Sequence, residues 1–262
     1  MESTDAKVIE QAVDVARRAV KAAADAALRH FRGGILVEKK PDASPVTIAD
    51  REAEAAMLAT IRAAFPEHAV LGEETGQHAG DNAWRWIIDP IDGTRGYTRG
   101  GPFWGPLCAL EHGGRVVVGA FALPVLGESY WGGRGLGAYQ DGKRLTVSSV
   151  ARVAEATVCI GEPKAFASPA LVDGTLKLMR EAASTRCPGD LGGGAYVLSG
   201  RAEAWMEAGV QIWDVAPFQV LIEEAGGTFT DLAGRASIAS GSAVVSNGRV
   251  HAEVLQAFGG AR

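Results

Sequence analysis

Apolar residues recur every three or four positions along the first part of the chain. They are Val8, Ile9, Ala12, Val13, Ala16, Ala19 and Val20, and they fall on one face of a helix. The pattern predicts a long amphipathic helix from Asp5 to about Phe31, ended by the glycines at 33 and 34. A capping box, in which Thr47 precedes Asp50 by three residues, predicts a second helix that runs to Pro66.

The middle of the chain changes to short apolar runs of strand length. Strands are predicted at residues 69–71, 84–88, 107–111, 116–123 and 129–131, with turns such as 112–114 between them. From residue 169 helices alternate with strands: helices to about 183, near 194–200, after 213 and from 250, and strands at 202–207, 228–230 and 244–246. The pattern is typical of the mixed α/β class.

No linker, tandem repeat or low-complexity block interrupts this pattern. We expect one compact unit of two closely joined halves, residues 1–147 and residues 148–262. The chain has 262 residues, of which 47% are hydrophobic, and this is enough for a substantial core.

Charge and motif content exclude several kinds of partner. With 26 basic and 31 acidic residues the net charge is −5, and no stretch gathers enough Lys and Arg to neutralise the phosphates of a nucleic acid. The N-terminal segment carries charges every few residues, unlike a signal peptide or a membrane-spanning helix. We therefore expect a cytoplasmic protein that binds neither nucleic acid nor membrane. The three cysteines form no zinc motif. The sequence also contains no EF-hand loop of the kind that a calcium-binding regulator would have.

Two aspartates lie three residues apart in the segment DPIDGTRGY, residues 89–97. Pro90 and Gly93 permit a sharp turn, so Asp89 and Asp92 can lie on the same side of the chain where it leaves the strand. Carboxylates so close together repel unless a cation joins them, and Mg²⁺ prefers carboxylate and carbonyl oxygens. The alternative is that both aspartates cap a turn and the start of a helix.

Two further acidic positions can complete such a metal site. In LGEETG, the adjacent residues Glu73 and Glu74 point in opposite directions at a strand end, so at most one of them faces the metal. In IWDVAP, Asp214 precedes an apolar helix with Pro217 in its first turn, which is the pattern of an N-cap aspartate. Taken alone, this pattern favours a cap at Asp214.

Together these segments resemble those of the inositol monophosphatase family of Mg²⁺-dependent, lithium-sensitive phosphatases. The resemblance is carried by KPDASPVTIAD at 40–50, GEE at 72–74, WIIDPIDGT at 86–94, GLGAYQDGKRLTVSS at 135–149, and WDVAP with EEAGG at 213–227. It covers nearly the whole chain. The fold that it implies is a layered α/β/α/β/α sandwich of the inositol monophosphatase and fructose-1,6-bisphosphatase type, usually assembled as a homodimer.

The resemblance also implies ligands for two or three Mg²⁺ ions. Glu73, Asp89 and the carbonyl of Ile91 resemble the ligands of the first ion, while Asp89, Asp92 and Asp214 resemble those of the second. Asp89 would then bridge two cations, which resolves the repulsion between the neighbouring carboxylates.

The implied reaction is in-line attack of a metal-activated water on a phosphate monoester, without a phosphoenzyme. Glu73 and the Thr94–Asp50 pair resemble the family's water-activating groups. Asp92, Gly93 and Thr94 resemble its phosphate-binding turn, consistent with the anion preference of helix N-termini. Asp50 is also the acidic end of the predicted capping box, so both roles stay open for it.

Two segments bear on the substrate, because the family also hydrolyses histidinol phosphate, fructose bisphosphate and adenosine bisphosphates. RGGPFWGPLCAL at 99–110 resembles the RGxPxWxxLxAL pattern of histidinol-phosphate phosphatases more than the inositol enzymes, which makes Trp104 a candidate pocket wall; the alternative is a core aromatic. In CPGDLGGGAY at 187–196, Asp190 matches the GDxxxY pattern of the same branch, although Tyr196 arrives two positions later, after three glycines.

Histidinol phosphate carries an ammonium group and an imidazole, so it suits an acidic pocket. Asp190 and Glu207 are the candidates to pair with the amine, although Asp190 can equally be a loop or cap residue. Glu207 also matches the position at which inositol enzymes hold a hydroxyl. Arg186 is a further candidate substrate contact, with a surface charge as the alternative. We expect L-histidinol phosphate as substrate; the alternatives are inositol 1-phosphate, a broad range of sugar phosphates, or a non-catalytic interaction protein of the same fold.

Overall fold

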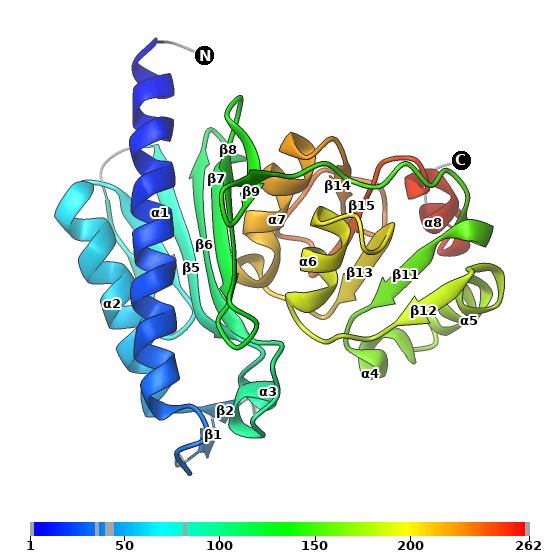
Figure 1. Cartoon of the computed structure of the whole chain (residues 1–262), viewed down its shortest axis with the longest axis horizontal. Coiled ribbons are helices and arrows are strands. Elements are labelled where there is room, and N and C mark those ends of the chain that lie inside the picture. Colours follow the sequence, from blue (N-terminus) through cyan, green and yellow to red (C-terminus); the bar gives the residue numbers. More distant parts are fainter. Residues whose placement is uncertain (1–2, 35–36, 40–44, 81–82, 260–262) are drawn as a thin grey trace.

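The structure is a computed structural model that describes residues 3–34, 37–39, 45–80 and 83–259. Its main elements form five layers, seen side by side in Figure 1: two helices, a large sheet, a middle layer of helices, a smaller sheet and an outer group of helices. This is the α/β/α/β/α sandwich expected from the sequence. Residues 40–44, at the start of the first matching motif, lie outside the described residues.

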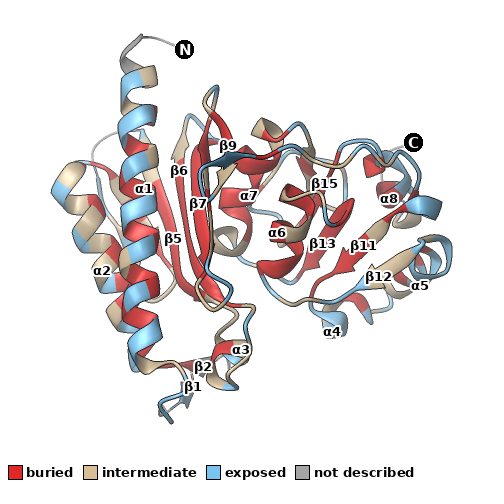
Figure 2. Ribbon diagram, viewed as in Figure 1, coloured by how far each residue is buried: buried red, intermediate tan, exposed pale blue. Residues whose placement is uncertain are grey.

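Two long helices form the first layer. α1 (Ser3–His30) and α2 (Ile48–Ala64) pack against each other and against one face of the large sheet. Both form where the sequence predicts them, and the capping box of α2 is present: the Thr47 hydroxyl accepts the N–H of Ala49, and Asp50 accepts the N–H of Thr47. Figure 2 shows α1 exposed on its outer face and buried toward the sheet.

The large sheet has eight strands. In spatial order they are β10 (Lys143–Arg144), β9 (Gly137–Gln140), β8 (Glu128–Gly133), β7 (Arg115–Leu123), β6 (Gly105–His112), β5 (Trp84–Asp92), β3 (Ala69–Gly72) and β4 (Gly76–His78). Neighbouring strands are antiparallel except β3 and β5, which run parallel. β5 is therefore held on both sides, which fixes the place where its C-terminal end leaves the sheet.

The middle layer lies between the two sheets and consists of α6 (Gly192–Leu198) and α7 (Ile212–Glu224). Its hydrophobic core joins the two halves of the chain, because Phe121 from the large sheet packs against Phe218 of α7, with ring centroids 4.9 Å apart. Almost every residue of α7 from Val215 to Ile222 is buried, which a helix enclosed by two sheets requires.

Three glycines let α6 approach its neighbours closely. A Cβ atom on Gly193 would lie 2.1 Å from Cδ1 of Trp205, and a Cβ atom on Gly194 would lie 2.2 Å from Cε1 of Phe218. Real Cβ atoms do not come so near, so each glycine leaves room for an aromatic ring. This packing gives a physical reason for the glycines that stand where bulkier residues are expected.

The smaller sheet and the remaining helices complete the sandwich. The sheet has the order β12 (Ser184–Arg186), β11 (Thr157–Ile160), β13 (Ala204–Ala208), β15 (Ser242–Ser246) and β14 (Thr228–Thr230). Its outer face packs on α4 (Pro163–Phe166), α5 (Val172–Glu181) and α8 (His251–Ala257). The short elements are β1 (Glu38–Lys39), β2 (Pro45–Val46), α3 (Thr94–Thr98) and the 3₁₀ turn Val153–Glu155. Within the described part of the chain, no helix is both long and apolar enough to span a membrane.

Two elements differ from the prediction where the site begins. β5 continues to Asp92 instead of ending at Ile88, because it stays paired with β6 beyond the apolar run. α7 begins at Ile212, so Asp214 is its third residue and not its N-cap, and Pro217 lies inside the helix and not in its first turn. The strands β1, β2, β4, β9, β10, β11 and β12, of two to four residues, were not predicted, since such short runs carry little periodicity.

Candidate active site

A bulge at the end of β5 brings Asp89 and Asp92 to one side of the sheet. Asp89 pairs with Leu107 and Asp92 with Gly105, so three steps along β5 match two steps along β6. Residues three apart on a regular strand point to opposite faces, and one extra residue restores the same face. Pro90 lies in this bulge, where a missing N–H costs no ladder hydrogen bond.

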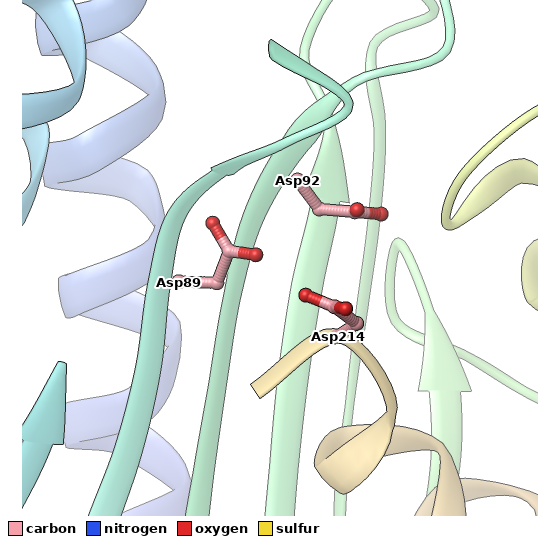
Figure 3. Close-up of side chains that lie close together, drawn as sticks. All are labelled: Asp89, Asp92 and Asp214. Carbon is pink, nitrogen blue, oxygen red and sulfur yellow. The ribbon is translucent and has the colours of Figure 1, made fainter. Parts of the chain in front are cut away.

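The first turn of α7 carries the third carboxylate. Asp214 Oδ2 accepts the N–H of Gln211 at 2.7 Å, the capping-box bond that fixes the side chain at the helix N-terminus. In Figure 3 the carboxylates of Asp89, Asp92 and Asp214 point toward a common centre between β5 and α7. One oxygen from each lies within 4.8 Å of the others, a spacing that a single metal ion can span.

Glu73, on the loop after β3, approaches the same cluster. Its N–H donates to the carbonyl of Ile88 at 3.2 Å, which ties this loop to the residue before Asp89. Its charge raises the pKa of Asp89 and of Asp214, so its carboxylate lies close to both. Glu73 is therefore the glutamate of the GEE motif that joins the cluster, as expected for one of the two.

Burial and mutual repulsion oppose ionisation of these carboxylates. Burial raises the pKa of Asp89 well above its usual value, and Glu73, Asp92 and Asp214 raise it further. Burial also raises the pKa of Asp92 well above normal and that of Asp214 to about 7. Among the described residues no Lys or Arg forms an ion pair with these three aspartates. An all-oxygen set of this kind fits a hard divalent cation, which would supply the missing positive charge.

Asp50 makes contacts consistent with both of the roles left open for it, through different oxygens. Oδ2 accepts the N–H and the hydroxyl of Thr47 at 2.7 Å each, which completes the capping box. Oδ1 lies 3.4 Å from the hydroxyl of Thr94, which is also 3.0 Å from the carbonyl of Ile91. Burial raises the pKa of Asp50, which is fully enclosed. A helix cap and a contact to the candidate site thus coexist in one side chain.

Gly93 lies between the carboxylate cluster and the loop of Asp190. Its φ of +82° is left-handed, and a Cβ there would lie 2.8 Å from Asp190 Oδ2. Only glycine can adopt this left-handed φ and also leave room for the Asp190 carboxylate without strain. The N–H of Leu191 donates to Asp92 Oδ2 at 2.7 Å, so the loop of Asp190 is anchored on a candidate metal ligand.

A cavity of about 620 Å³ opens beside this cluster. Its wall contains Asp92, Asp190, Glu207 and Asp214 together with Arg95, Gly161, Glu162, Pro163, Lys164, Ala165, Cys187, Gly189, Trp205, Ala208, Gly209 and Val210. The cavity therefore joins the candidate metal site to the smaller sheet, and carboxylates outnumber cationic groups in its wall.

Glu207 is a fixed, buried carboxylate in this cavity. Its Oε1 accepts the indole N–H of Trp205 at 3.1 Å, and its Oε2 accepts the N–H of Glu162 at 3.4 Å. A Cβ on Gly161 would lie 2.0 Å from its carboxyl carbon, so this glycine makes room for it. Burial raises the pKa of Glu207 to about 8, and burial with the charge of Glu162 raises the pKa of Asp190 to about 6.

The structure places two of the expected substrate contacts outside this cavity. Trp104 is fully buried in the core beneath α1, against Phe31 and Tyr97 at ring distances of 5.1 and 4.7 Å. Its position does not support a pocket wall and matches the alternative of a core aromatic. Arg186 is exposed, donates to the carbonyl of Thr185 and does not line the cavity.

The wall residues that sequence reasoning missed include Arg95, Glu162 and Trp205, whose side chains can contact a substrate. Glu162 follows β11, which runs parallel to β12 and β13. The carboxyl ends of parallel strands meet at one edge of a sheet, where ligands bind. The apolar run before Glu162, once recognised as a strand, would have indicated it.

Comparison with known proteins agrees with this geometry. The model of the inositol monophosphatase family matches residues 5–260. A histidinol-phosphatase of Streptomyces coelicolor is 39% identical over 244 residues, which cover 89% of this chain and 91% of that protein. A histidinol-phosphatase of Chlorobaculum parvum is 37% identical and covers 96% of each chain. The solved structure of the extragenic suppressor protein suhB of Bartonella henselae matches with a TM-score of 0.89 and 29% identity, over 95% of this chain and 98% of that one. The chain therefore belongs to the inositol monophosphatase family and is a phosphoric monoester hydrolase.

Proposed function

We propose that the protein is a Mg²⁺-dependent phosphatase that hydrolyses L-histidinol phosphate to L-histidinol and phosphate. The observation that carries this proposal is the acidic cavity beside the carboxylate cluster, whose wall contains both Asp190 and Glu207, where they would face a substrate held at the proposed metal site. The names of the relatives from Streptomyces and Chlorobaculum support the same substrate.

The metal-binding residues that we propose are the five expected from the sequence: Glu73, Asp89, the carbonyl of Ile91, Asp92 and Asp214. The convergence of three of these carboxylates within 4.8 Å supports them. Bound Mg²⁺, in two or three copies, would lower the pKa of water and neutralise the phosphoryl oxygens. The five residues would hold the ions, with Asp89 buried and with Asp92 and Asp214 reaching the cavity from which water and substrate would enter.

Other residues of the chain handle the water and the phosphate in this proposal. The Thr94 hydroxyl, between Asp50 and the carbonyl of Ile91, can take a proton from water and pass its own to Asp50. Glu73 is the second acceptor for this proton. The N–H groups of Gly93 and Thr94 bind the phosphate. Asp92, whose side chain accepts the N–H of Leu191, would act on the phosphate through the metal ion that it holds.

The far end of the cavity fits a cationic substrate better than a neutral one. An ammonium group near Asp190 and Glu207 would form charge-assisted hydrogen bonds that a cyclitol hydroxyl forms less strongly. Asp190 is the discriminating residue, since Glu207 matches a position that also serves inositol enzymes. Arg186 and Trp104 are not part of this proposal, because neither lines the cavity.

A direct comparison of substrates tests the proposal. The experiment measures kcat/KM for L-histidinol phosphate and myo-inositol 1-phosphate, with and without Mg²⁺, in the parent protein and in Asp190→Asn. We expect a preference for histidinol phosphate of about 10²-fold, which corresponds to about 2.7 kcal/mol of transition-state discrimination. We expect Asp190→Asn to reduce this preference. A preference for the inositol ester would instead identify an inositol monophosphatase.

A second candidate function belongs to another class, that of a non-catalytic interaction protein. The similarity to a structure named as a suppressor protein is the observation that favours it. Release of phosphate from a generic aryl phosphate distinguishes the two, since a scaffold would release none. Light scattering of the purified protein tests the homodimer, and fractionation of cells tests the cytoplasmic location; both stay predictions.

A further inference from the structure

A second acidic side chain of α2, besides Asp50, is buried near the candidate metal site. Glu54 is one helical turn after Asp50 on the same face of the helix and is fully buried. Glutamate is almost never fully buried unless its charge is compensated, so its partners indicate what it does.

The partners of Glu54 are backbone groups of the loop that carries Glu73. Its Oε2 accepts the N–H of Glu74 at 2.9 Å, and its Oε1 accepts the N–H of Thr75 at 2.8 Å. Both carboxylate oxygens therefore accept hydrogen bonds from consecutive residues of one turn. Successive backbone N–H groups bind anions in the same way. Two hydrogen bonds from consecutive N–H groups to one carboxylate form a clamp that fixes the turn.

Gly72 allows the Glu54 carboxylate to come so close. A Cβ on Gly72 would lie 2.7 Å from Oε1 and 2.9 Å from Oε2. Glu73 follows directly, and its own N–H is bound to the carbonyl of Ile88 in β5. Three successive N–H groups, those of residues 73, 74 and 75, are thus fixed from two sides, which leaves the backbone of Glu73 little freedom.

We infer that Glu54 is a positioning residue of the metal site, which holds the Glu73 loop so that its carboxylate stays beside Asp89. The inference rests on the proposed function, since it gives Glu73 the role of a metal ligand. Residues that orient ligands from behind typically change metal affinity by about 10- to 100-fold when they are replaced. One face of α2 then supports the site at two places: Asp50 contacts the hydroxyl of Thr94, and Glu54 holds the loop that carries Glu73.

The test is the Kd for Mg²⁺ alone, measured by isothermal titration calorimetry without substrate. Glu54→Gln keeps the size of the side chain but replaces one acceptor oxygen by an amide that opposes the loop N–H. We expect its Kd for Mg²⁺ to rise about 10-fold. The matched control is Glu52→Gln on the exposed side of α2, which should leave the Kd unchanged. At saturating Mg²⁺, the KM of Glu54→Gln for the phosphate ester should stay within about twofold of the parent, because Glu54 does not line the cavity.

A purely structural role would give a different result. It would lower the melting temperature of Glu54→Gln and leave the Kd for Mg²⁺ unchanged, and this outcome overturns the inference. If Glu54→Gln does not fold, Gly72→Ala tests the same clamp by displacing the carboxylate, and an unchanged Kd in that variant also overturns it. A parent protein that binds Mg²⁺ but hydrolyses no phosphate monoester would refute the proposed function separately, since the Kd comparison needs no substrate.

Discussion

Glu207→Gln removes a buried ionisable group from the cavity while keeping an oxygen that accepts the Trp205 N–H. Burial raises the pKa of Glu207 from 4.5 to about 8, so the folded protein keeps this proton to a higher pH than the unfolded chain. The stabilising effect of the raised pKa is fully present below the unfolded pKa and is lost as the pH rises through the folded pKa. The parent protein therefore loses stability as the pH rises from about 4.5 to about 8. The glutamine variant does not show the part of this loss that comes from Glu207.

The size of the effect follows from the shift. Within the window each pH unit removes about 1.4 kcal/mol from the free energy of unfolding, so the parent loses roughly 3 kcal/mol between about pH 5.5 and pH 8. Solvent screens little of this, because Glu207 is only 5% exposed. For a chain of this size, a change of 1 kcal/mol in the free energy of unfolding shifts the melting temperature by about 2–4 °C. We therefore expect the melting temperatures of the parent and of Glu207→Gln to diverge by about 6–12 °C over this pH range.

The assay is thermal unfolding in EDTA at both pH values, followed by circular dichroism. Asp190 and Asp214 also have a raised pKa, so both proteins lose stability with pH, and the difference between them is the readout. Glu10→Gln, on the exposed face of α1, is the control and should follow the parent. Parallel curves for the parent and Glu207→Gln would refute the reasoning, since they would mean that Glu207 ionises as it does in water.

Four further outcomes can be measured on the same purified proteins. Asp92→Asn and Asp214→Asn should each abolish turnover and weaken Mg²⁺ binding with an intact circular dichroism spectrum; near-normal rates in both would remove them from the site. Trp205→Phe deletes the indole N–H that Glu207 accepts, so the KM for histidinol phosphate should rise by about tenfold while turnover of an aryl phosphate stays unchanged. Gly193→Ala should cost about 1–3 kcal/mol in chemical denaturation, because its Cβ meets Trp205, and an unchanged midpoint would contradict the packing. Mg²⁺ at 100 times its Kd should raise the melting temperature of the parent by about 5–10 °C over EDTA, and the absence of a shift would argue against a metal site.

Features encoded within a few neighbouring residues could be predicted from the sequence. α1 and α2 were predicted because their apolar spacing and the Thr47–Asp50 capping box are local signals. The bulge that brings Asp89 and Asp92 to one face was not, because it depends on how β5 pairs with β6. A sequence shows that the two carboxylates are close along the chain, but their common direction comes from that pairing.

The substrate pocket was harder to predict for the same reason. Trp104 stands in a suggestive motif, yet the side of the sheet that it faces is decided by the register of distant strands, and it faces α1. Trp205 and Glu162 stand in no motif that we recognised, because their place in the cavity comes from the order of β11, β12 and β13. Local patterns indicated the residues that form the carboxylate cluster better than those that line the cavity.

The separation of the metal ligands along the chain has a consequence for synthesis in the cell. Asp89 and Asp92 leave the ribosome more than a hundred residues before Asp214, which must first be placed by α7 between the two sheets. Until then the nascent chain carries Asp89 and Asp92 without the third carboxylate of the cluster, so the part of the proposed metal site that needs Asp214 is incomplete. Completion of the proposed metal site would therefore come late in assembly, and a chain truncated before α7 would keep the DPIDGT motif but lack the Asp214 carboxylate of the cluster.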